Sequence, residues 1–345
     1  MSGTMADTAS IRRRALALIS EDGRGVATRL TREFGLTRQA VSKHLKALGS
    51  EGLVEAEGST RARVYRLVPL ASGLRTYPRE GLAEDVVWRE LFAPVMSGLP
   101  ENAVDIWRYG VTEMVNNAVD HSDSPTVEVG VWRNAVKTLG MVRDSGEGIF
   151  LKIQRAFGFC DPRESILELA KGKLTTDPVN HTGEGIFFAS RVFDSFLIRS
   201  GSLSFFHDKY PLDLLADRPE GTSGTTVNMW LANDSPRTLK SVFDEFAVPE
   251  EYTFAKTIVP VRLAQYEGEK LVSRSQAKRL SMRFERFRHV ILDFAEVVEI
   301  GQAFADELFR VFAQAHPQVE LSAVNMTPEV ERMVQRARIG PGDTA

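Results

Sequence analysis

The chain has 345 residues, of which 43% are hydrophobic and 26% are charged. This length predicts two or three domains, and the composition is that of a globular protein with ample material for a core. No apolar run approaches the roughly 18 residues that a membrane-spanning helix needs, so we expect no membrane association. The single cysteine, Cys160, excludes an intrachain disulfide and a cysteine-rich zinc site, and it fits a cytoplasmic location.

Charge is distributed unevenly along the chain. Residues 1–75 contain 13 Lys and Arg against 7 Asp and Glu, which gives this segment a charge of +6. Because the whole chain carries −3, the remaining residues carry −9. A basic N-terminal segment attached to an acidic body predicts that this segment meets a polyanion.

The sequence divides into three predicted units. Stretches rich in proline and polar residues, at residues 75–81 and 233–251, predict the joins between them. The first unit (1–75) has helical patterns and ends in a hairpin, and the second (80–235) mixes helices, alternating strands and glycine-rich loops. The third (250–340) alternates strand with helix. We therefore expect a multidomain α/β protein.

Two short helices near the N-terminus are separated by a glycine. Residues 26–34 predict a helix that Gly35 ends, and Thr37 caps the helix that follows. The apolar residues of that second helix recur at helical spacing and face a core, which leaves a polar outer face: Arg38, Gln39, Ser42 and Lys43. Helices joined in this way are typical of a helix-turn-helix, whose second helix enters the major groove of DNA.

The hairpin that follows carries basic residues near its turn. Residues 53–67 read LVEAEGSTRARVYRL, which predicts two short strands forming a wing, with Arg61 and Arg63 near its tip. Residues 36–67 resemble the winged-helix domain of ArsR-type and related bacterial repressors. The resemblance implies DNA binding, with the second helix reading bases and the two arginines contacting phosphates or the minor groove. The alternative is a winged helix that contacts another protein.

A polar row on an otherwise apolar helix marks the second unit. Glu113, Asn117 and His121 recur every four residues, so they share one helical face. Downstream, Asp-x-Gly-x-Gly-Ile follows a predicted strand, Gly-x-Gly precedes a predicted helix, and Gly-Thr heads another strand. Each motif alone is weak, but Glu-x-x-x-Asn followed by these three in order resembles the GHKL ATPases. The resemblance implies an α/β sandwich that binds Mg-ATP between its helices and a flexible lid.

The same resemblance implies a role for each motif residue. Asn117 would supply a side-chain oxygen to Mg²⁺, and Glu113 would orient or deprotonate the attacking water. Asp144 would accept a hydrogen bond from the adenine amino group. The other implied nucleotide contacts are Gly146 and Gly148 beside the base, Gly183 and Gly185 beside the phosphates, Thr225 in the adenine pocket, and Lys171 and Lys173 in the lid. For either lysine the alternative is simple solvation, and His121 has no assigned role.

Two absences narrow the class of nucleotide-binding protein. There is no Gly-x-x-x-x-Gly-Lys-Ser/Thr motif, so KGKLT at residues 171–175 is not a P-loop. The segment between Arg75 and the Glu113 helix is too short for a helical hairpin with a phosphorylatable histidine. This argues against a conventional sensor histidine kinase.

The third unit has a recognisable strand-to-helix segment. Residues 290–312, VILDFAEVVEIGQAFADELFRVF, resemble STAS domains, the fold of anti-sigma-factor antagonists, which implies a module for a protein partner or for self-association. In those antagonists a Ser or Thr near the start of the helix is phosphorylated by a GHKL serine kinase. Residues 301–304 read GQAF and hold no hydroxyl, which argues against a kinase fused to its own substrate.

The order of the three units predicts a cytoplasmic bacterial transcription regulator. Binding or hydrolysis of Mg-ATP in the second unit would modulate DNA binding by the first, and the third would bind a protein partner. Two alternatives remain open. One is a serine/threonine kinase of the anti-sigma-factor type acting in trans, and the other is a GHKL ATPase machine, such as a defence component, whose winged helix binds protein.

Overall fold

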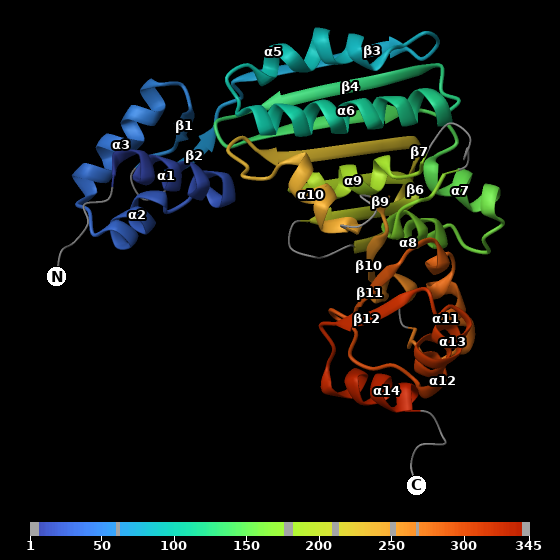
Figure 1. Ribbon diagram of the computed structural model, residues 1–345. Coiled ribbons are helices and arrows are strands. Elements are labelled where there is room, and N and C mark those ends of the chain that lie inside the picture. Colours follow the sequence, from blue (N-terminus) through green and yellow to red (C-terminus); the bar gives the residue numbers. More distant parts are fainter. Residues whose placement is uncertain are drawn as a thin grey trace.

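The computed structural model describes residues 7–59, 63–175, 182–208, 214–248, 253–266 and 269–339. Within these residues the strands form a five-stranded sheet, a three-stranded sheet and two hairpins, and helices accompany each of the larger sheets (Figure 1). The expected mixed α/β architecture with several sheets is therefore confirmed. None of the helices in this part of the chain has the length and apolar character needed to cross a bilayer.

The N-terminal unit is built from three helices and a hairpin. Its elements are α1 (Thr8–Asp22), α2 (Val26–Phe34), α3 (Arg38–Ser50), β1 (Val54–Glu57) and β2 (Val64–Leu67). Gly35 ends α2 in the left-handed conformation, with φ 63°, and Thr37 Oγ1 accepts a hydrogen bond of 3.2 Å from the Ala40 backbone N–H to cap α3. Strands β1 and β2 pair in antiparallel fashion. Both signals read from the sequence thus lie where expected.

The middle unit is an antiparallel sheet with helices on one face (Figure 1). Its strand order is β3-β4-β5-β7-β6. The strands are β3 (Ala71–Pro78), β4 (Thr126–Arg133), β5 (Lys137–Asp144), β6 (Ser195–Asp208) and β7 (Leu214–Ala232). The helices are α4 (Glu84–Val87), η2 (Trp88–Phe92), α5 (Ala93–Met96), α6 (Glu101–His121), α7 (Ile149–Phe157), α8 (Arg163–Lys171), α9 (Gly185–Val192) and α10 (Leu239–Phe246). Alternate residues of β4 (Val127, Val129 and Val131) are fully buried on the helix-covered side.

The two segments predicted to be joins are ordered elements. Strand β3 pairs along its whole length with β4, so the predicted boundary at residue 75 falls inside the edge strand of the middle sheet. Helix α10 lies within the second predicted join, where Thr238 and Ser241 form a capping box. In both places the polar and proline residues that suggested a loop instead occupy an exposed sheet edge and a helix cap.

The C-terminal unit, here called the tail, has a parallel sheet of order β10-β11-β12. Its strands are β10 (Lys256–Pro260), β11 (His289–Asp293) and β12 (Glu320–Val324), and a hairpin of β8 (Ala247–Val248) and β9 (Thr253–Phe254) precedes them. Its helices are η3 (Val261–Ala264), α11 (Arg274–Ser281), η4 (Phe284–Arg286), α12 (Gln302–Asp306), η5 (Glu307–Phe312), α13 (Ala313–Ala315) and α14 (Pro328–Ile339).

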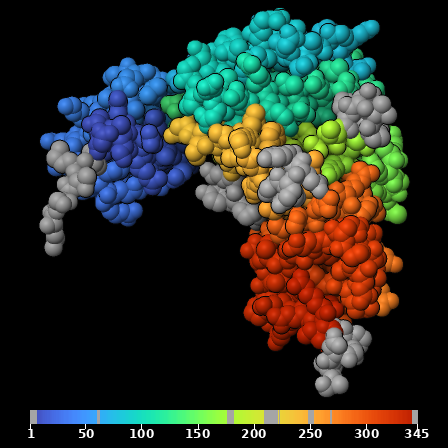
Figure 2. All heavy atoms as spheres, in the orientation of Figure 1, coloured from blue at the N-terminus to red at the C-terminus, as the bar shows by residue number. Residues whose placement is uncertain are grey.

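Buried apolar residues of the described chain form two clusters. One belongs to the N-terminal unit and includes Leu18, Leu30 and Val41. The other runs from the middle unit into the tail, where the rings of Phe187 on α9 and Phe254 on β9 lie 4.6 Å apart between centroids. The middle unit and the tail therefore share one core. On the face seen in Figure 2 the tail packs against the middle unit and leaves a gap to the N-terminal unit.

Candidate functional site

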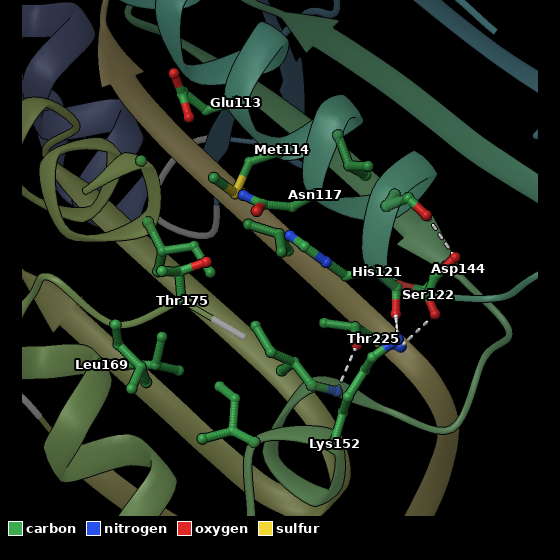
Figure 3. A pocket seen from close by; sticks show the side chains of 18 of the residues that line it. Glu113, Met114, Asn117, His121, Ser122, Asp144, Lys152, Leu169, Thr175 and Thr225 are labelled. Atoms are coloured by element: carbon green, nitrogen blue, oxygen red, sulfur yellow. Dashed lines mark hydrogen bonds between the residues drawn. The ribbon is translucent and has the colours of Figure 1, made fainter. Parts of the chain in front are cut away.

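A cavity lies between α6, the end of β5, α7 and the start of α9 (Figure 3). It is open to solvent, and its lining combines polar with apolar side chains, as is usual for small-molecule sites. Most of the residues singled out in the sequence line this cavity: Glu113, Asn117, Asp144, Gly148, Gly183, Gly185 and Thr225. They come from four segments that are far apart in the chain, and the fold brings them together.

Helix α6 supplies the polar row. Glu113, Asn117 and His121 are half-buried and line the cavity at successive turns, as labelled in Figure 3. On the opposite side Val111 and Val115 are fully buried in the core. The amphipathic spacing read from the sequence therefore places one side of α6 on the sheet and the other on the cavity.

Asp144 ends β5 at the floor of the cavity and is 8% exposed. Its Oδ1 accepts hydrogen bonds from the backbone N–H groups of Gly146 (2.9 Å) and Thr225 (3.2 Å). Thr225 Oγ1 in turn accepts one from the Ile149 N–H at 3.0 Å. Burial raises the pKa of the Asp144 carboxyl, and the hydrogen bonds from Gly146 and Thr225 act against that rise. The network fixes the orientation of this carboxylate.

Two of the predicted glycines allow close approaches that no side chain would permit. A Cβ on Gly146 would lie 1.8 Å from the Ser122 carbonyl oxygen, so the turn after β5 touches the end of α6. A Cβ on Gly185 would lie 2.0 Å from Glu113 Oε2, so the first turn of α9 rests against that carboxylate. Gly146 does not itself line the cavity; its contribution is to bring β5 and α6 together.

The start of α9 faces the cavity with groups that suit an anion. The first N–H groups of a helix have no partner within it, and here they belong to a turn that begins at Gly185. Glu184 at the N-cap is half-buried, and burial raises its pKa against the opposing charge of Lys173. Burial also raises the pKa of Tyr109, and the negative charges of Glu113 and Glu184 raise it further. Of these three groups only Glu113 lines the cavity.

Lys171 and Lys173 do not line the cavity, and the expectation that they reach a bound phosphate is corrected by their contacts. Lys171 is fully buried, and its Nζ donates to the Met282 carbonyl at 3.0 Å. Lys173 Nζ donates to the Arg286 carbonyl at 3.0 Å. Both lysines contact the tail, whose core is continuous with that of the middle unit. No local motif encodes this contact between distant segments.

The lysine that does line the cavity was missed in the sequence. Lys152 on α7 donates from Nζ to the His121 carbonyl at 2.6 Å and to Asp123 Oδ2 at 3.0 Å. It lies in the first turn of the helix that Gly148 begins, which is the signal that could have identified it. Its ammonium group gives the cavity a positive charge opposite the α9 end.

The predicted DNA-contacting residues form an exposed basic surface. Arg38, Gln39 and Lys43 are exposed on α3, and Ser42 beside them is half-buried. Arg63 is exposed directly before β2, and Arg61 lies outside the described residues. Within the described chain, the side chains of Arg38, Lys43 and Arg63 form no ion pair. By contrast, Arg12 and Arg14 on α1 pair with Glu51 and Glu33.

Comparison with known families identifies part of the tail. Residues 276–331 match the model of a STAS-like domain of unknown function (DUF4325). The match runs from α11 into α14, so the STAS-like character predicted for this part of the chain is confirmed. No curated protein matches the chain.

Proposed function

We propose that this protein is an ATP-binding transcriptional regulator. In this proposal the middle unit is a GHKL-type α/β sandwich, the N-terminal unit is a DNA-binding winged helix, and Mg-ATP in the cavity modulates DNA binding. The observation that carries it is the convergence of the α6 row, the Asp144 turn, the start of α9 and Thr225 on one cavity. These are the motifs whose order along the chain resembles GHKL ATPases.

Adenine is assigned to the floor of the cavity. Asp144 Oδ1 is already held by two backbone N–H groups, so Oδ2 is the oxygen that we expect to accept a hydrogen from the adenine amino group. Guanine carries a carbonyl acceptor at the same position, so an acceptor here selects adenine. The apolar residues Met114, Val142 and Ile186 also line the cavity and offer surface against which a base can pack.

The phosphates and Mg²⁺ are assigned to the space between α6 and the start of α9. The backbone N–H groups of that first turn and the positive end of the helix favour an anion. Among the described residues no cluster of three His, Cys, Asp or Glu could hold a metal ion by itself. This fits Mg²⁺, which retains several waters and takes ligands from substrate phosphates, with the Asn117 side-chain oxygen as a single protein ligand.

A short connection links the cavity-bearing sheet to the N-terminal unit. Residues 68–70 join β2 to β3, and backbone hydrogen bonds pin both ends of this link. The Val68 N–H donates to the Leu53 carbonyl at 3.1 Å, and the Leu70 N–H donates to the Arg133 carbonyl at 2.7 Å. In this proposal a change in the sheet reaches the N-terminal unit through this three-residue link. For ATP to switch the protein, it must bind one arrangement more tightly by a few kcal/mol.

DNA binding through the N-terminal unit predicts a specific change in salt dependence. Arg63→Ala removes one exposed cation that we assign to a phosphate contact, so affinity for random-sequence duplex should fall for all fragments. The slope of log affinity against log salt concentration should decrease by about one unit. Fluorescence anisotropy at several salt concentrations measures both quantities.

Arg13→Ala is the matched control for this experiment. Arg13 is also an exposed arginine of the N-terminal unit, but its Nε lies 3.8 Å from Asp234 of the middle unit. Its replacement should leave the salt slope of the wild-type protein unchanged. The absence of any affinity of the full-length protein for duplex DNA at low salt would contradict the DNA assignment and favour the alternative of a protein-binding winged helix.

A further inference from the structure

The wall of the cavity formed by α8 and the residues after it has two sides. Leu169, Leu174 and Thr175 line the cavity on one side. Glu168, Lys171 and Lys173, which alternate with them, contact the tail on the other side. Every few residues along this segment, the chain therefore touches both the proposed nucleotide site and the tail. The segment is called the α8 wall below (residues 168–175).

A buried ion-pair cluster joins the α8 wall to the tail. Glu168 pairs with Lys171 and, through Oε2, accepts a hydrogen bond of 2.9 Å from Arg283 of the tail. Glu168 and Lys171 are almost completely inaccessible to solvent, and the side chain of Arg283 is 10% exposed. Burial lowers the pKa of Lys171, and the charge of Glu168 opposes that change. Burying such a cluster costs desolvation energy, so apolar side chains could join α8 to the tail at lower cost.

The tail also holds the backbone of the α8 wall. Thr257 Oγ1 donates to the Lys171 carbonyl at 2.7 Å, and the guanidinium groups of Arg283 and Arg286 donate to the Lys173 carbonyl. Lys173 has φ 54° and follows Gly172, whose φ is 86°. A lysine in the left-handed region is a strained conformation that persists only where its surroundings hold it. Here the tail supplies those surroundings.

We propose that the Glu168–Lys171–Arg283 cluster is a positioning device through which the tail sets the α8 wall of the nucleotide cavity. Arg283 is the positioning residue on the tail side, because its Nη1 donates to the carboxylate of Glu168 and its Nη2 donates to the carbonyl of Lys173. The consequence for nucleotide affinity rests on the function proposed above. Since coupling is reciprocal, a partner that draws the tail away from α8 would change nucleotide affinity, and nucleotide would change the affinity for that partner.

The test replaces Arg283 in the full-length protein. Arg283→Met keeps an unbranched apolar chain but removes both sets of hydrogen bonds, and Arg283→Lys keeps the charge but cannot bind both acceptors at once. Amide hydrogen exchange of residues 169–175 should accelerate about tenfold in Arg283→Met and by less in Arg283→Lys, while β4 and β5 keep wild-type protection. The dissociation constant of Mg-ATP should rise about tenfold in the Met variant.

Arg310→Met is the matched control. Arg310 makes a bidentate ion pair with Asp306, and both residues belong to the tail. This replacement should leave exchange of residues 169–175 unchanged. Wild-type exchange of the α8 wall in both Arg283 variants overturns the proposal, as does faster exchange with unaltered ATP affinity. If the wild-type protein binds no ATP, the proposed function fails, and the exchange result alone still decides whether the tail positions the wall. If the Met variant does not fold, the Lys variant decides.

Discussion

Asp144→Asn is expected to weaken binding of Mg-ATP by about 3 kcal/mol, or on the order of 100-fold. The reason is that Asp144 Oδ1 accepts hydrogen bonds from two backbone N–H groups, those of Gly146 and Thr225. They will hold the asparagine carbonyl at the Oδ1 position, which turns the NH₂ group toward the adenine amino group. Two donors then face each other where, in the proposed complex, the adenine amino group donates to a charged acceptor. Isothermal titration calorimetry on the folded variant measures the loss.

The same replacement should shift base preference. Guanine presents a carbonyl acceptor where adenine presents an amino group, so the asparagine NH₂ suits guanine better than the carboxylate does. The ratio of ATP affinity to GTP affinity should therefore fall in the variant. Asp293→Asn is the matched control. Asp293 is also a buried aspartate at the end of a strand, and its Oδ1 accepts a hydrogen bond of 2.9 Å from the backbone N–H two residues later, that of Ala295. An unchanged ATP affinity in Asp144→Asn contradicts the adenine assignment.

The pH dependence of binding follows from the same carboxylate. Burial raises the pKa of Asp144 above its ordinary value of 3.8, so on acidification it loses its charge earlier than an exposed aspartate. Only the ionised form is the acceptor that adenine requires, so ATP affinity is retained above this pKa and is lost as the pH falls through it. Asp144→Asn should lack that component, whereas titration of the ATP phosphates is common to both proteins.

Glu113→Gln is expected to slow ATP turnover by two to four orders of magnitude while ATP binding is retained. A positioned general base contributes an acceleration of that size, and glutamine preserves the shape of the side chain but cannot take a proton. Glu113 also lies against the first turn of α9, so loss of its negative charge should not weaken binding of the phosphates. Phosphate release at saturating ATP, together with the dissociation constant, separates these two effects.

Glu101→Gln provides the control for turnover. Glu101 is an exposed glutamate in the first turn of the same helix, and its replacement should leave both quantities at wild-type values. Phosphate release in Glu113→Gln that equals the wild-type rate would falsify the base assignment. Appearance of the γ-phosphate on a partner protein, with none released free, would support the alternative of a kinase acting in trans.

Local patterns predicted the features whose causes are local. Glu113 and Asn117 share a face because of helical spacing, and Thr37 and Gly35 bound their helices because caps are decided by the nearest few residues. Gly146 and Gly185 could be chosen from their motifs, although the atoms that they approach, on α6 and its C-cap, are visible only in the fold. The order of these motifs along the chain was sufficient to predict most of the residues that line the cavity.

The features that were missed depend on contacts between distant segments. Lys171 and Lys173 read as solvated or phosphate-facing residues, yet both meet residues of the tail more than 100 positions away. Lys152 lines the cavity because α7 packs beside the end of α6, and the only local signal was its place in the first turn after Gly148. Likewise, the segment at 75–81 looked like a join because the pairing partner of β3 lies some fifty residues away along the chain.

Control of DNA binding by ATP is tested most directly by measuring the affinity of the full-length protein for random-sequence duplex with and without Mg-ATP at fixed salt. We predict that Mg-ATP changes this affinity by at least about tenfold, and that Asp144→Asn loses the change at the same ATP concentration. Equal affinity and equal salt dependence in the presence and absence of Mg-ATP would contradict the proposed regulation.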